Sequence, residues 1–146
     1  MVWAGTLDEG HLRRSVYFTV KRSQLSRTLQ LFDAPDAVLS AGNRPATITA
    51  PQALMFLNSP FVRARARDFA QRLLPEAKAS PANAIRRGYE LAVGRLPTPE
   101  EAADSAAFLA QQVESYRDRD TADVLRLALE DFCQVLFGLN EFVYID

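Results

Sequence analysis

The chain has 146 residues, of which 48% are hydrophobic and 24% are charged. These proportions are typical of a globular protein and exclude the disordered, collagen-like and disulfide-scaffold classes. Seventeen basic and 18 acidic side chains give a net charge of -1, which argues against a nucleic-acid partner. The length suits one domain, so residues 1–146 are expected to form a single domain, or the C-terminal part of one, with a flexible lead-in at 1–12.

The charges are unevenly distributed along the chain. Nine basic and four acidic residues lie up to Arg67, whereas eight basic and 14 acidic residues follow from Asp68 onward. Fifteen of the basic residues are arginines, whose planar guanidinium group suits carboxylates, phosphates and sulfates. The simplest interpretation is ion pairing between the two halves. The alternative is an anion-binding surface on the basic half.

The first 50 residues carry weak structural signals. Val16 to Val20 alternate apolar and polar side chains, which is typical of a half-buried strand. Apolar residues at helical spacing follow and lead into a turn at Asp33 to Asp36. A polar loop containing Gly42 and Pro45 comes next.

Helix starts are clearly marked in the rest of the chain. The signals are Thr49 with Gln52, then Ser59-Pro60, Ser80-Pro81 and Thr98-Pro99-Glu100-Glu101. Gly94 is a suitable stop for the helix that begins near Ser80. The helix that begins near Ser59 has one apolar stripe, formed by Val62, Ala66, Phe69 and Leu73.

The C-terminal third is expected to hold two long helices. The second, from about Thr121 to Leu139, is apolar on most sides, which places it at the centre of the bundle. The tail Phe142 to Ile145 is interpreted as a short strand that could pair with Val16 to Val20. The predicted fold is mainly α, an orthogonal-to-antiparallel bundle of about five helices with this possible short β element.

Familiar catalytic motifs are missing from the sequence. His11 has no second histidine or cysteine at metal-ligand spacing, and Cys133 lies in an apolar helical run that favours a buried thiol. There is no phosphate-binding glycine loop, no haem-attachment sequence and no apolar run long enough to span a membrane. We therefore predict no catalytic residue, metal or cofactor in this chain, and whether it belongs to an enzyme stays open.

Several arginines are candidates for an anion site, because a strand and a loop could bring them together. They are Arg13, Arg14, Arg22 and Arg44. In a helix, Arg65 would point away from Arg63 and Arg67. This disfavours a row of arginines on one face that could bind nucleic acid.

Five blocks of sequence, in order along the chain, resemble one bacterial family. They are Arg13-Tyr17 with Lys21-Arg22, Leu31-Asp36, Ala50-Leu54 with Leu57-Val62, Gly94-Glu101, and Asp131-Leu136 with Asn140-Asp146. In these blocks the chain resembles the C-terminal part of planctomycete-specific domain one, a family of unknown function in large multidomain bacterial proteins. The resemblance implies an exported protein from which this chain is cut, often with an upstream cytochrome-c-like module.

Some polar positions within or near these blocks are site candidates by resemblance. They are Asp33, Asp36, Gln52, Asn58 and Glu141. Our first hypothesis is a non-catalytic interaction or scaffold domain whose partners are other domains of the same polypeptide. The alternative is part of a binding or processing site for sulfated or acidic polysaccharide that uses the arginine-rich half.

Overall fold

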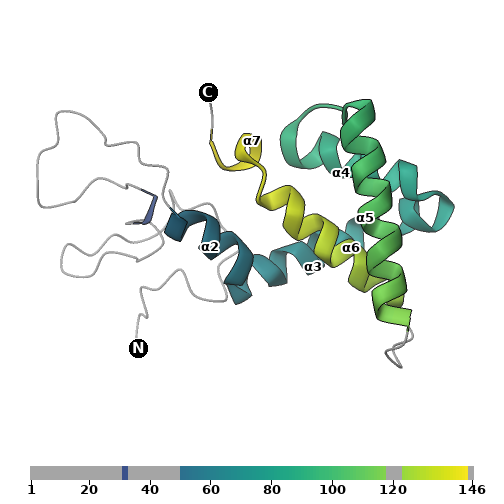
Figure 1. Cartoon of the computed structure of the whole chain (residues 1–146), viewed down its shortest axis with the longest axis horizontal. Coiled ribbons are helices and arrows are strands. Elements are labelled where there is room, and N and C mark those ends of the chain that lie inside the picture. Colours follow the sequence, from purple (N-terminus) through teal and green to yellow (C-terminus); the bar gives the residue numbers. More distant parts are fainter. Residues whose placement is uncertain (1–30, 33–49, 118–122, 145–146) are drawn as a thin grey trace, which may run out of the picture. The chain divides into compact units, whose positions relative to one another are not determined.

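The computed structural model describes residues 31–32, 50–117 and 123–144 (Figure 1). The chain divides into two compact units, Met1–Leu54 and Met55–Asp146, and the boundary falls within helix α2 (Ala50–Asn58). The remaining described helices lie in the second unit: α3 (Pro60–Ala79), α4 (Pro81–Val93), α5 (Pro99–Arg117), α6 (Val124–Phe137) and α7 (Asn140–Val143). The predicted mainly α class is therefore confirmed for the described ranges.

The predicted helix starts at Ser59-Pro60 and Ser80-Pro81 are confirmed. Pro60 and Pro81 lie in the first turn of α3 and α4, directly after extended serines. Proline fits there because a first-turn N–H has no partner within the helix. Gly94 ends α4 with a φ of 75°, the left-handed conformation that glycine adopts without a steric penalty.

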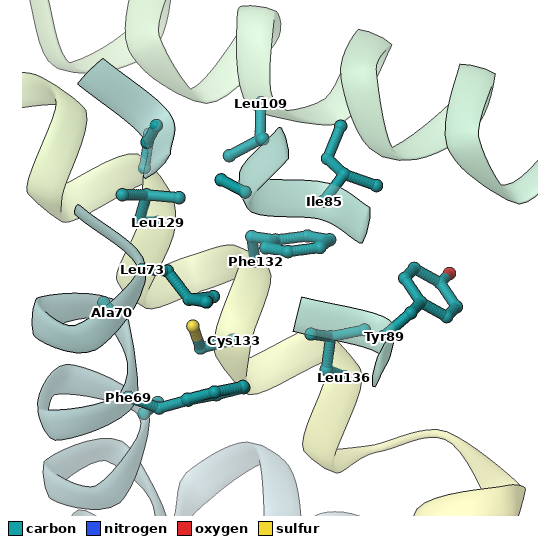
Figure 2. Packing of buried hydrophobic residues seen from close by; sticks show 14 residues of the cluster. Phe69, Ala70, Leu73, Ile85, Tyr89, Leu109, Leu129, Phe132, Cys133 and Leu136 are labelled. Carbon is teal, nitrogen blue, oxygen red and sulfur yellow. The ribbon is translucent and has the colours of Figure 1, made fainter. Parts of the chain in front are cut away.

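The core of the second unit forms around α6. Figure 2 shows side chains from this helix meeting those of α3, α4 and α5. The predicted stripe of α3 is buried, and α6 contributes five core side chains, Ala128, Leu129, Phe132, Cys133 and Leu136. The central position predicted for the last long helix is therefore confirmed.

Gly88 allows α4 to approach α6 closely. A Cβ atom at this position would lie 3.0 Å from both Leu136 Cδ1 and Phe132 Cε1. Both of these side chains are almost fully buried, so neither has free space into which it can move. The small size of Gly88 therefore determines how these two helices pack.

The predicted C-terminal strand is wrong for Phe142 and Val143, because they belong to the helical turn α7. The N–H groups of both residues donate to the Leu139 carbonyl, at 3.0 and 3.2 Å. These local bonds use donors that a strand would leave for a neighbouring strand. The last long helix is also shorter than predicted, since Asp123 precedes it and Gly138 follows it.

Some predictions concern parts of the chain that the structure does not describe. The strand at Val16 to Val20 and the lead-in at 1–12 lie outside the described residues. Among the helices of the described ranges, none combines the length and apolarity needed to cross a membrane.

Candidate functional site

Two clusters of polar side chains join distant parts of the second unit. The Arg63 cluster consists of Arg63, Tyr116, Asp131 and Gln134. The Arg95 cluster consists of Arg95, Thr98, Glu101 and Glu141. Their longest side-chain links join residues 71 and 46 positions apart, so both clusters depend on the tertiary fold.

The Arg63 cluster ties α3 and α5 to α6. Arg63 Nη1 donates to Asp131 Oδ1 at 2.6 Å and to Gln134 Oε1 at 2.8 Å. The Tyr116 hydroxyl donates to the other carboxylate oxygen, Asp131 Oδ2, at 2.7 Å. This hydrogen bond, with burial and the charge of Asp131, raises the pKa of Tyr116. Burial lowers the pKa of Arg63, but the hydrogen bond and charge of Asp131 outweigh it and raise that pKa.

Gln134 extends the same cluster to the end of α2. Its Nε2 donates to the Leu57 carbonyl at 2.7 Å and to the Phe56 carbonyl at 3.2 Å. Carbonyl groups in the last turn of a helix have no partner within that helix. Gln134 therefore supplies hydrogen bonds to free carbonyl groups at the C-terminal end of α2, while its side-chain oxygen Oε1 accepts from Arg63.

A second set of ion pairs lies beside the Arg63 cluster. Glu130 is 1% exposed, and its carboxylate pairs with Arg126 and lies 3.5 Å from Arg67 Nε. Arg63 and Arg67 thus pair with α6, whereas Arg65 pairs with Asp68 in its own helix at 3.1 Å. The predicted divergence of Arg65 is confirmed, and Arg63 and Arg67 join the basic half of the chain to acidic residues of α6.

The Arg95 cluster is built on the predicted capping box of α5. The Thr98 N–H donates to Glu101 Oε2 at 2.8 Å, and the Glu101 N–H donates to Thr98 Oγ1 at 3.2 Å. Arg95 binds the same carboxylate through Nη1 and Nη2, each at 2.7 Å. The hydrogen bonds from Arg95 and from the Thr98 backbone lower the pKa of Glu101 to about 2.

A second edge of the Arg95 guanidinium, formed by Nε and Nη2, binds α7. Nε and Nη2 each donate to the Glu141 carboxylate at 2.8 Å, and these bonds lower the pKa of Glu141. Nη1 also donates to the Leu96 carbonyl at 3.0 Å, and the group lies 5.7 Å from the centre of the Tyr89 ring. Hydrogen bonds to Glu101 and Glu141 raise the pKa of Arg95, which therefore stays charged throughout the usual pH range.

Three of the nine predicted site residues lie in the part of the chain that the structure describes. The other six lie outside the described residues: Arg13, Arg14, Arg22, Asp33, Asp36 and Arg44. In the first unit, Gln52 is buried and its Nε2 donates to the Leu31 carbonyl at 2.8 Å. In the second unit, Asn58 is the exposed last residue of α2, and Glu141 belongs to the Arg95 cluster.

Sequence reasoning missed the role of most members of the two clusters. Arg95 and Gln134 lie within blocks that carried the family resemblance, which was the available signal. Their partners could not be found from local spacing, because Gln134 contacts Leu57 and Arg95 contacts Glu141 only after folding.

Cys133 is fully buried in the core, as predicted. Burial, with the nearby charge of Glu130, raises the pKa of its thiol to about 12. The thiol is therefore protonated at neutral pH and lacks the thiolate character of a nucleophile. Within the described part of the chain, no group of three or more His, Cys, Asp or Glu side chains could hold a metal ion.

The described surface also carries an open apolar pocket of about 280 Å³. It lies between Ile85 and Arg86 of α4, the loop residues Leu96 and Pro97, and Ala102 of α5. Arg86 at its edge pairs with Glu90 at 3.3 Å.

The fold and the two clusters define a helical domain whose polar side chains join its helices to one another. A family model described as PSD1, protein of unknown function (DUF1553), matches residues 2–109. The chain therefore belongs to the planctomycete-specific domain 1 family, as its sequence blocks predicted. No curated protein and no solved structure matches it. The matched range contains Arg95 and Glu101 and ends within α5, before Asp131 and Glu141.

Proposed function

We propose that this chain is a helical interaction domain of a larger exported bacterial protein, with other domains of the same polypeptide as its partners. It performs no catalysis and needs no cofactor of its own. The observation that carries the proposal is the Arg95 cluster, in which one guanidinium forms five hydrogen bonds to two carboxylates and a backbone carbonyl. A side chain used in this way organises the fold.

The other arginines of the described ranges support the same role. Seven arginines besides Arg95 pair with carboxylates there, Arg63 and Arg67 across helices and the others locally in sequence. The helices and the loop between α4 and α5 display exposed apolar side chains, among them Leu57 (62% exposed), Leu96 (51%) and Val135 (49%). Exposed apolar side chains on an ordered framework suit protein contacts.

Hydrogen exchange can test this proposal on the complete polypeptide. We expect amides near Leu96 or Leu57 to exchange more slowly in the complete polypeptide than in residues 1–146 alone, because a neighbouring domain covers them. Leu96→Ser should reduce that protection, whereas the exposed Ala103→Ser on α5 should not. Identical exchange in both forms would contradict the proposal.

The polysaccharide hypothesis is a second candidate, motivated by the 15 arginines against two lysines. It predicts salt-sensitive binding of residues 1–146 to a sulfated glycan, measured by calorimetric titration at low and high salt. Replacing Arg13, Arg14, Arg22 and Arg44 with Gln should abolish this binding. Absence of binding at low salt would remove the hypothesis.

A further inference from the structure

Two adjacent side chains of α7 contact the rest of the second unit. Glu141 binds Arg95 with two hydrogen bonds of 2.8 Å. The Phe142 ring stacks on Phe137, with ring centres 4.9 Å apart, and meets the edge of Phe56 at 6.4 Å. We call Arg95, Phe56 and Phe137 the α7 socket.

The socket is organised by residues outside α7. Glu101 binds both terminal nitrogens of Arg95, while the Tyr89 ring lies beside the guanidinium group. Phe137 also stacks against Phe69, with ring centres 5.7 Å apart. A site held in this way needs little reorganisation to accept a ligand.

The occupant, in contrast, is weakly anchored. None of the four residues of α7 is buried, the Glu141 side chain is 54% exposed and Phe142 is 39% exposed. A single helical turn has no intrinsic stability in water, so its position depends on these side-chain contacts. Such a segment can open locally while the core stays folded.

We propose that the α7 socket recognises an acidic residue followed by an aromatic residue in a partner protein, and that α7 occupies it as a competing internal segment. The guanidinium group binds a carboxylate through two parallel N–H groups, and the two phenylalanines bind a neighbouring ring. The proposal rests on the interaction function proposed above and names the chemistry of one partner segment.

Competition by α7 predicts the size of the effect. A segment tethered by a short linker acts at an effective concentration in the millimolar range, so a free peptide must displace it. Removing the anchoring side chains of α7 should therefore strengthen peptide binding by about tenfold or more.

The test uses the full chain and a labelled peptide with the sequence of residues 139–144, measured by fluorescence anisotropy. The receptor is the double variant Glu141→Gln with Phe142→Ala, which empties the socket without removing a buried side chain. It should bind the peptide at least about tenfold more tightly than the native chain. Peptides that carry Glu141→Gln or Phe142→Ala should bind weakly.

Receptor variants check the location of the site. Arg95→Gln in the emptied chain should lose binding, whereas Arg86→Gln, another exposed arginine of this region, should retain it. Because Arg95 also supports α5, thermal unfolding must show that this variant is folded. If it is not, Phe56→Leu provides the second test of the socket.

Two results would overturn the proposal. One is a folded, emptied chain that binds no peptide at millimolar concentration, or binds the native and Glu141→Gln peptides equally. The other is dimerisation of the native chain that the double variant abolishes, since the socket would then hold α7 of a second copy. Neither result alters the hydrogen-exchange test of the interaction function.

Discussion

Helices α6 and α7 follow each other in the chain but are held in different ways. α6 buries six residues, Ala128, Leu129, Glu130, Phe132, Cys133 and Leu136, whereas α7 buries none. Burial of apolar surface stabilises in proportion to its area, while exposed ion pairs contribute little. We therefore expect substitutions around α6 to lower the stability of the whole second unit, and substitutions around α7 to act locally.

The largest effect is expected from Gly88→Val. Its new methyl groups would enter space in which even a Cβ lies 3.0 Å from Phe132 and Leu136. Overpacking of this kind costs about 1–3 kcal/mol, and we expect the upper end because both neighbours are buried. Chemical denaturation measures this loss. Ala103→Val, on the exposed face of α5, should cost no more than about 0.7 kcal/mol, the ordinary helix-propensity difference.

Asp131→Ala should have the next largest effect. It removes the carboxylate that accepts from Arg63 and Tyr116 and that joins three helices. Loss of a partly buried acceptor for a charged donor costs about 1–3 kcal/mol. Glu114→Ala, which breaks an exposed pair with Arg117, is the matched control and should change the free energy of unfolding by less than about 0.5 kcal/mol. Equal losses would show that the Arg63 cluster adds no stability.

Thr98→Ala should cost less, about 1 kcal/mol, because it removes one half of the capping box of α5. Thr98→Ser keeps the hydroxyl acceptor and should restore most of the stability. Thermal unfolding of the three proteins checks this order. A Thr98→Ala protein as stable as the native chain would mean that Arg95 and Glu101 hold the start of α5 without the threonine.

Lowering the pH is expected to have the smallest effect on stability. The pKa of Glu101 is lowered from 4.5 to about 2, so its stabilising contribution is present above pH 4.5 and is lost as the pH falls toward 2. The pKa of Glu141 is lowered in the same direction by Arg95. Carboxyl NMR titration should show both depressed values, and Arg95→Gln should bring both back toward 4.5. Unchanged titration in that variant would contradict the geometry of the cluster.

Much of the helical framework could be predicted from local sequence. Proline after serine, the Thr98 to Glu101 capping box and Gly94 act within one helical turn, so their effect needs no knowledge of distant residues. The divergence of Arg65 from Arg63 and Arg67 follows from helical periodicity alone. The C-terminal strand was predicted wrongly because a short apolar run fits a strand and a helical turn equally well.

The roles of most polar side chains that join the helices could not be predicted from the sequence. Gln134 is an ordinary helix-surface residue by its spacing, and Glu141 was a site candidate only by resemblance. The structure shows that Gln134 supports the end of α2 and that Glu141 holds α7 on Arg95. The family blocks marked the segments involved without indicating which segments meet.

The sequence by itself determined that this part of the chain is helical, where most of its helices begin and which stripe of α3 faces the core. These features depend on interactions between residues at most a few positions apart. Only the tertiary structure decided that α6 packs against Gly88. It also decided that Arg63 and Arg67 of the basic half pair with acidic residues of α6, and that Arg95 binds Glu141. Those contacts join residues many positions apart, and their geometry exists only once the helices have packed.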